Sequence, residues 1–191
     1  MNPEPARKSY HHGDLRSALI EAGLKLLAGR DADDLGLREV ARAVGVSATS
    51  VYRHFPDKNA LLTALAGEGL TRLAVEQHEA SEAAGGGDAG FSATGAAYVR
   101  FALANPALFR LIFANPLVAK MLEEPPAGSP DAMAFLKANA AALADRRGVD
   151  ARVVVARAWS ISHGLAMLML DGQLPVDDAL IDRVIDVNAL A

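Results

Sequence analysis

Five side chains able to donate hydrogen bonds lie within ten residues of one another: Thr49, Tyr52, Arg53, His54 and Lys58. Hydroxyl, guanidinium, imidazole and ammonium groups all bind phosphate oxygens, and a guanidinium fork also matches base edges. The chain contains no cysteine, which excludes thiolate catalysis and thiolate metal sites. The chemistry that these residues favour is contact with a nucleic acid, and the alternative is an ordinary solvated helix.

The elements that must position these residues are two short predicted helices, Leu37–Val44 and Ser47–His54. Gly45 tolerates the left-handed conformation of a sharp turn between them, and Ser47 can cap the second helix. Apolar residues mark the inner sides: Val40, Ala41, Val44, Val51 and Phe55. Helix, glycine turn and crossing helix form the helix-turn-helix pattern. Flanking helices must support so short a pair, which leaves the outer face free to enter a DNA major groove.

The rest of the 191-residue chain is also predicted to be all-α, because alanine and leucine dominate and strand-type runs are scarce. We expect a three-helix DNA-binding head on a larger helical body for ligand binding and dimerisation. The remaining helices are predicted near 14–28, 57–80, 91–104, 105–114, 131–147, 151–171 and 177–188, with loops at 83–90 and 123–130. The predicted parts are a flexible basic arm at 1–12, the helix-turn-helix domain at 13–56, a connecting helix at 57–82 and the effector-binding and dimerisation domain at 83–191.

The segment from Gly13 to Leu65 resembles the DNA-binding head of the TetR family of transcriptional repressors. The residues that carry the resemblance are Val40-Ala41, Gly45-Val46-Ser47, Val51-Tyr52, His54-Phe55, Lys58 and Leu61-Leu62. It implies that the second short helix enters the major groove and that Tyr52, His54 and Lys58 contact phosphates. Ser47, Ala48, Thr49 and Arg53 are the further candidates for base or phosphate contact. Gly36 departs from the family's usual Thr or Ser, so we expect Asp34 to cap the first short helix.

The segment ahead of the first long helix carries Arg7 and Lys8. Such an arm could lie along phosphates or in a minor groove, and the alternative is a tail with incidental charge. His11 and His12 lack the spacing of a metal site, so no metal and no cofactor is expected.

The body helix WSISHGLAMLML places Trp159, His163 and Met167 four residues apart on one face. Together with Gly164, this pattern resembles a C-terminal domain of the TetR family named for Trp-His-Gly. The predicted effector pocket is apolar and comprises Phe101, Phe109, Phe113, Trp159, His163 and Met167. The alternative is an ordinary core in which His163 is buried and satisfied by one neighbour.

A second face of this helix carries small residues, Ala156, Ser160 and Gly164, which let another helix approach closely. A later apolar stripe consists of Leu180, Ile181, Val184 and Ile185. We expect these two faces to form a homodimer interface. The apolar run 153–170 contains Arg157 and His163, so it fits a buried helix better than a membrane span.

Neither a nucleophile–base pair, nor a phosphate-binding loop, nor a paired His/Glu motif is apparent, so an enzyme is not expected. The prediction is a cytoplasmic, nucleoid-associated regulator that binds double-stranded operator DNA and is released by a small apolar effector. The rival is a helical adaptor with the same fold and no DNA binding. Loss of DNA affinity with rising salt would distinguish the two.

Overall fold

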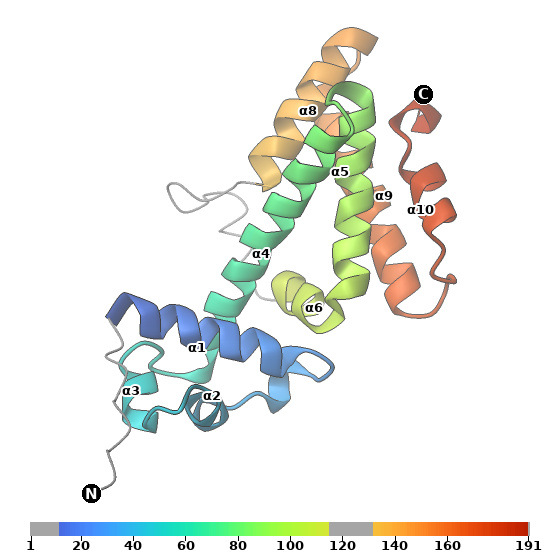
Figure 1. The fold of residues 1–191 in the computed structure, drawn as a ribbon. Helices are drawn as coiled ribbons and strands as arrows, with labels where there is room; N and C mark the ends of the chain where they lie inside the picture. The colour runs from blue at the N-terminus through green and yellow to red at the C-terminus, as the bar shows by residue number, and fades with distance from the viewer. Residues whose placement is uncertain (1–11, 115–131, 191) are drawn as a thin grey trace, which may run out of the picture. The chain divides into compact units, whose positions relative to one another are not determined.

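The computed structural model describes residues 12–114 and 132–190, and all regular elements in these ranges are helices, which confirms the all-α prediction (Figure 1). The chain forms two compact units, Met1–Leu65 and Ala66–Ala191. The boundary falls inside helix α4 (Lys58–Ala83), so this single helix contributes residues to both units. The predicted loop at 123–130 lies outside the described residues.

The first unit is a small helical head. Besides the start of α4, its elements are α1 (His12–Leu27), the short 3-10 helix η1 (Ala32–Asp34), α2 (Leu37–Val44) and α3 (Ala48–Tyr52). Leu19, Val40 and Val51 are fully buried in its core. A Cβ on Gly23 would lie 2.9 Å from a methyl of Leu65, so glycine allows α1 to approach α4 closely.

The turn between α2 and α3 follows the predicted pattern. Gly45 ends α2 in the left-handed region with φ 78°, and the N–H of Val46 donates to the carbonyl of Ala41 at 3.0 Å. The Ser47 hydroxyl oxygen accepts from the backbone N–H of Ser50 at 3.2 Å, so the predicted cap is confirmed. Asp57 likewise accepts from the N–H of Ala60 at 2.8 Å at the start of α4.

Two sequence expectations about these helices are wrong. Asp34 does not cap α2, because it belongs to η1 and Gly36 occupies the cap position without a side-chain hydrogen bond. The second short helix is shorter than predicted, since the α-helix ends at Tyr52 and Arg53 is its C-cap.

The second unit is a larger helical body. Its elements after α4 are α5 (Gly87–Ala104), α6 (Pro106–Ala114), α8 (Ala132–Arg147), α9 (Ala151–Leu170), α10 (Asp178–Ile185) and the 3-10 helix η2 (Val187–Leu190). Helices α5 and α9 pack along one another, and both α8 and α10 contact each of them (Figure 1).

Helix α5 begins at Gly87, four residues before the predicted start, so the glycine-rich loop is much shorter than 83–90. Gly85, Gly86 and Gly87 all have positive φ and reverse the chain within a few residues. Gly90 then lies against α4, where a Cβ would come within 2.6 Å of the Ser81 hydroxyl oxygen. The glycines therefore serve a tight α4–α5 turn instead of a long loop.

Candidate functional site

The outer face of α3 carries the donors that the sequence singled out. Thr49, Tyr52 and Arg53 are exposed, and Tyr52 retains 45% of its accessible surface. On the opposite side, Val51 is 0% exposed and Phe55, just after the helix, is 1% exposed. These two residues anchor the segment to the head and leave its donors free for a partner.

Three further candidates have roles inside the head. The Ser47 hydroxyl is engaged with Ser50 through both the backbone N–H and the Ser50 hydroxyl, at 2.8 Å for the latter. Ala48 and His54 are half-buried. Ser47 is itself exposed, but its hydroxyl is engaged at the start of α3, and Ala48 has no polar side chain.

Lys58 at the start of α4 is half-buried, and its ammonium group donates to the backbone carbonyl of Asp33. This bond ties η1 to the start of α4. A lysine ammonium has three N–H donors, so contact with a phosphate remains compatible with it. Arg7 and Lys8, the predicted arm contacts, lie outside the described residues.

Further cations of the head were missed by the sequence reasoning. Arg38 and Arg42 are exposed and four residues apart, so they share one face of α2. Within the part of the chain that the structure describes, no carboxylate forms an ion pair with either of them or with Arg53. The exposed Arg16 lies over the ring of Phe55, with 5.4 Å from its guanidinium carbon to the ring centroid. The four-residue spacing of Arg38 and Arg42 was the signal that could have identified them.

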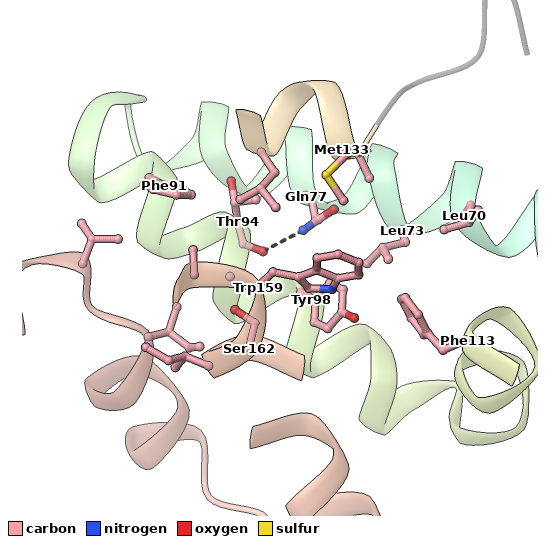
Figure 2. A pocket seen from close by; sticks show the side chains of 17 residues that line it. Leu70, Leu73, Gln77, Phe91, Thr94, Tyr98, Phe113, Met133, Trp159 and Ser162 are labelled. Atoms are coloured by element: carbon pink, nitrogen blue, oxygen red, sulfur yellow. Dashed lines mark hydrogen bonds between the residues drawn. The ribbon is translucent and has the colours of Figure 1, made fainter. Parts of the chain in front are cut away.

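The body contains a mainly apolar cavity (Figure 2). The volume of the cavity is about 60 Å³. Of the predicted pocket residues, Phe113 and Trp159 line it. The other lining residues come from α4, α5, α8, α9, α10 and η2, and those that the sequence reasoning missed include Leu70, Leu73, Gln77, Thr94, Tyr98 and Ser162.

The remaining predicted pocket residues lie elsewhere. Phe101 and Phe109 are buried core residues at 2% and 0% exposure, and neither they nor Met167 and His163 are among the described residues that line the cavity. Tyr98 connects His163 to the cavity, because its hydroxyl lies 2.8 Å from His163 Nδ1.

Aromatic rings surround the His163 imidazole, with centroids at 4.8 Å for Phe113 and 5.5 Å for Phe109. Burial lowers the pKa of His163 and raises the pKa of the Tyr98 phenol well above its usual range, and a hydrogen bond from Trp159 offsets the rise at Tyr98 in part. Both groups are therefore held in their neutral forms near pH 7. A neutral phenol donates to the unprotonated Nδ1, which fixes the ring's remaining proton on Nε2.

The predicted dimer surface on α9 is exposed. Ala156 and Ser160 are exposed, and apart from the backbone of α9 and the two neighbouring residues, no heavy atom of the described residues lies within 4 Å of where a Cβ on Gly164 would be. Val153 and Leu168, on either side, are 50% and 45% exposed. This face therefore consists of small and apolar side chains together with the exposed Arg157, and the described residues of the single chain leave it uncovered.

The predicted stripe on α10 divides into two sets. Ile181 and Ile185 are buried at 1% and 5% within the chain itself, whereas Leu180 and Val184 are half-buried. Ile185 packs onto α5, where a Cβ on Gly95 would lie 2.6 Å from its methyl group. The two isoleucines thus hold α10 to its own body, and Leu180 and Val184 retain partly exposed surface.

Helix α9 has the length and apolar composition of a membrane-spanning helix. Leu165, Ala166 and Met169 are nevertheless buried in the body, where α9 packs against α5 and α8. It is a core helix of the body and not a membrane span.

Comparisons with known proteins match both units. Residues 19–65 match the N-terminal domain of bacterial regulatory proteins of the tetR family. Residues 91–188, about half of the chain, match the tetracyclin repressor-like C-terminal domain. This assignment fits the Trp-His-Gly resemblance of the body. No curated protein matches the sequence.

Several solved structures share the fold. A protein of unknown function from Rhodococcus sp. RHA1 is 32% identical with a TM-score of 0.74, covering 96% of this chain and 95% of that one. A tetR-family transcriptional regulator from Streptomyces coelicolor is 21% identical with a TM-score of 0.66, covering 89% and 78%. A protein from Mesorhizobium loti MAFF303099 that is described as a TetR-family transcriptional regulator is 17% identical with a TM-score of 0.69, covering 94% of this chain and 95% of that one.

The head combines a helix-turn-helix with exposed donors, and both units match domains of one family. These observations support a DNA-binding transcriptional regulator, and the chain belongs to the TetR family of bacterial regulatory proteins.

Proposed function

We propose that this protein is a cytoplasmic, ligand-responsive repressor that binds operator DNA as a homodimer and is released by a small, largely apolar molecule. The single observation that carries the proposal is the course of α4. This helix begins at Lys58, a candidate phosphate contact, and its residues Leu70, Leu73 and Gln77 line the cavity in the body. Nineteen residues separate Lys58 from Gln77, or roughly 28 Å of helix.

A ligand in the cavity would contact α4 directly, so a change in the position of this segment reaches the head through a continuous helix. Two half-sites are read together only when the recognition helices are spaced near one helical turn of DNA, about 34–36 Å, or a multiple of it. A small shift of α4 in each chain would therefore change operator affinity. The ligand releases DNA only as far as it binds the DNA-incompetent state more tightly, by about 1–3 kcal/mol in typical cases.

The dimer would use the uncovered face of α9, supported by Leu180 and Val184 of α10. Small residues at Ala156, Ser160 and Gly164 let the equivalent helix of a second copy pack closely. A two-fold arrangement of the same face is the commonest way in which homodimers form.

The test has two arms. Duplexes selected from random DNA identify the operator, and affinity is then measured against salt concentration. A repressor loses affinity steeply as salt rises, whereas the adaptor alternative shows no binding at all. Compounds that raise the thermal stability of the protein are then added to the operator complex. If each such compound leaves operator affinity unchanged, the protein is a constitutive DNA binder and the ligand-responsive part of the proposal fails.

A further inference from the structure

The walls of the body cavity are uncharged. None of the 17 described residues that line it is aspartate, glutamate, lysine, arginine or histidine. A charged ligand would lose its hydration without gaining a counter-ion, which is strongly unfavourable. Four aromatic rings, those of Phe91, Tyr98, Phe113 and Trp159, contribute to the walls (Figure 2). These rings favour an aromatic ligand through edge-to-face and offset contacts.

The cavity is small. A volume of about 60 Å³ favours a single-ring ligand over a polycyclic molecule.

Gln77 presents an unpaired acceptor to this cavity. It is 7% exposed, and its amide nitrogen donates to the backbone carbonyl of Thr94 at 3.3 Å (Figure 2). Because a carbonyl can only accept, this bond fixes which end of the amide is nitrogen and which is oxygen. Among the described residues, Gln77 Oε1 has no hydrogen-bond partner. The oxygen is not enclosed by the protein, so a donor from a ligand or from water can reach it.

Ser162 on α9 supplies a second unpaired group. It is 6% exposed, it lines the same cavity, and its hydroxyl forms no hydrogen bond with any residue that the structure describes. The Ser162 hydroxyl oxygen lies 3.1 Å from the position that a Cβ on Gly95 would take. Gly95 comes directly after Thr94, whose carbonyl accepts the hydrogen bond from Gln77. Gln77 and Ser162 therefore border the same turn of α5.

The other polar side chains in the wall are already paired. Thr94 donates its hydroxyl to the carbonyl of Gly90 at 2.9 Å, and the Tyr98 hydroxyl is bonded to His163. This leaves Gln77 Oε1, the second N–H of the Gln77 amide and the Ser162 hydroxyl as the unpaired side-chain polar groups of the described wall. A ligand hydroxyl can pair with Gln77 Oε1 and Ser162 together, because it donates one hydrogen bond and accepts another.

Resting on the proposed function, we propose that the cavity binds an uncharged single-ring aromatic hydroxyl compound of the phenol class. Its hydroxyl donates to Gln77 Oε1 and accepts from Ser162, and its ring packs among Phe91, Phe113 and Trp159. The class is narrower than a generally apolar effector, because the hydroxyl is required.

The test uses matched probes and a built-in reporter. Trp159 is the only tryptophan of the chain and lines the cavity, so its fluorescence reports binding directly. The full-length protein is titrated with 4-methylphenol, with para-xylene, which replaces the hydroxyl by a methyl group, and with the charged 4-methylbenzoate. We expect 4-methylphenol to bind about tenfold more tightly than para-xylene, because para-xylene leaves two buried polar groups unpaired. The benzoate should not bind at concentrations at which the phenol saturates.

Ser162→Ala removes one partner with little change in volume. It should reduce the preference for 4-methylphenol over para-xylene by about fivefold, as expected for one lost hydrogen bond. As a control, Gln173→Met changes an exposed glutamine just after α9 and should leave both affinities unchanged. Gln77→Met provides a second variant of similar volume that should likewise reduce the preference.

The assignment is overturned if none of the probes binds, if para-xylene binds as tightly as 4-methylphenol, if the benzoate binds, or if Ser162→Ala leaves the preference unchanged. Operator affinity, measured separately, distinguishes this failure from failure of the proposed function. Saturation by 4-methylphenol without any change in operator affinity refutes the switch and leaves the ligand assignment standing. Release from the operator by compounds that lack a hydroxyl refutes the assignment and leaves the switch standing.

Discussion

The outer faces of α3 and α9 are both left uncovered by their own chain, yet they have opposite chemistry. On α3 the exposed residues are Thr49, Tyr52 and Arg53, each carrying a hydrogen-bond donor. On α9 they include Ala156, Ser160 and Leu168, which are small or apolar. Each helix is anchored from the opposite side by fully or largely buried residues such as Val51 and Leu165.

The difference indicates two kinds of partner. Projecting donors match the oxygens of a polyanion, which are hydrated and lie at the surface. A face of small residues offers few directional bonds and gains stability only when another apolar surface lies flush against it. One helix is suited to DNA and the other to a protein surface, of which a second copy of this chain is the simplest case.

The largest expected effect comes from a charge on the α9 face. Gly164→Glu should convert a dimer at micromolar concentration into a monomer, since burying an unpaired carboxylate raises the dimer dissociation constant by about a thousandfold or more. The Cβ has open space within the single chain, so the monomer itself should remain folded. Light scattering measures the mass, and circular dichroism checks the fold.

Ala141→Glu, at an exposed site on α8, places the same charge on another surface as a control. A wild-type protein that is already monomeric at micromolar concentration would rule out the dimer altogether.

The next effect concerns base reading by α3. If Arg53 or Thr49 touches base edges, the alanine variants should lose about twentyfold in affinity for the selected operator, within the roughly 1–3 kcal/mol of a good base contact. Their affinity for random duplexes should change much less. Competition assays with the two DNA pools give the ratio, and equal losses on both pools would exclude base reading by these residues.

Lys58→Ala and Tyr52→Phe should weaken binding to operator and random DNA alike, by about tenfold for the lysine. The lysine variant should also flatten the salt dependence by about one unit of slope. Because Lys58 also donates to the carbonyl of Asp33, a stability loss of about 1 kcal/mol should accompany this change. Titrations over a range of salt concentrations and denaturant unfolding measure the two quantities.

Lys137→Ala, at an exposed position of α8, removes the same charge from the body. An equal decrease in the salt slope in this control would show that general charge, not contact by Lys58, sets the dependence.

The smallest effect comes from the buried side of α9. The pKa of His163 is lowered in the folded state because burial disfavours the imidazolium. At pH values below about 6.5, the ordinary pKa of histidine, the unfolded chain therefore binds more protons than the folded protein does. The free energy of unfolding is fully retained above that pH and falls as the pH drops below it. His163→Gln keeps an acceptor for Tyr98 and should make unfolding less sensitive to pH below about 6.5.

Denaturant unfolding of both proteins at several pH values measures this difference. Identical pH profiles for the two proteins would show that His163 does not contribute.

Sequence alone was sufficient for the turn between α2 and α3 because its determinants are local, although it did not give the cap of α2 or the end of α3. Gly45 sets the turn, Ser47 caps the next helix, and Val51 and Phe55 point inward by simple periodicity. The start of α5 was missed because a run of glycines fits a loop as well as a tight turn. Only the contact of Gly90 with Ser81 distinguishes the two cases.

The cavity could not be predicted in the same way, because it depends on packing between distant segments. Phe101 and Phe109 have the right chemistry but lie in the core. Gln77 looks like a surface residue until α5 covers it. One partial signal existed, since Phe91, Thr94 and Tyr98 recur at intervals of three and four residues and thus share one face of α5.

Because α4 is one continuous helix, a chimaera of this protein with a relative must preserve the rotational register of that helix. Each residue of an α-helix advances the chain by about 100° and 1.5 Å. In a chimaera joined within Lys58–Ala83, one additional residue would rotate the chain that precedes it by about 100°, more than a quarter turn, about the helix axis. An insertion of seven residues falls only about 20° short of two full turns. Junctions within α4 should therefore add or remove residues in numbers close to whole helical turns, so that the rotational register of the helix is preserved.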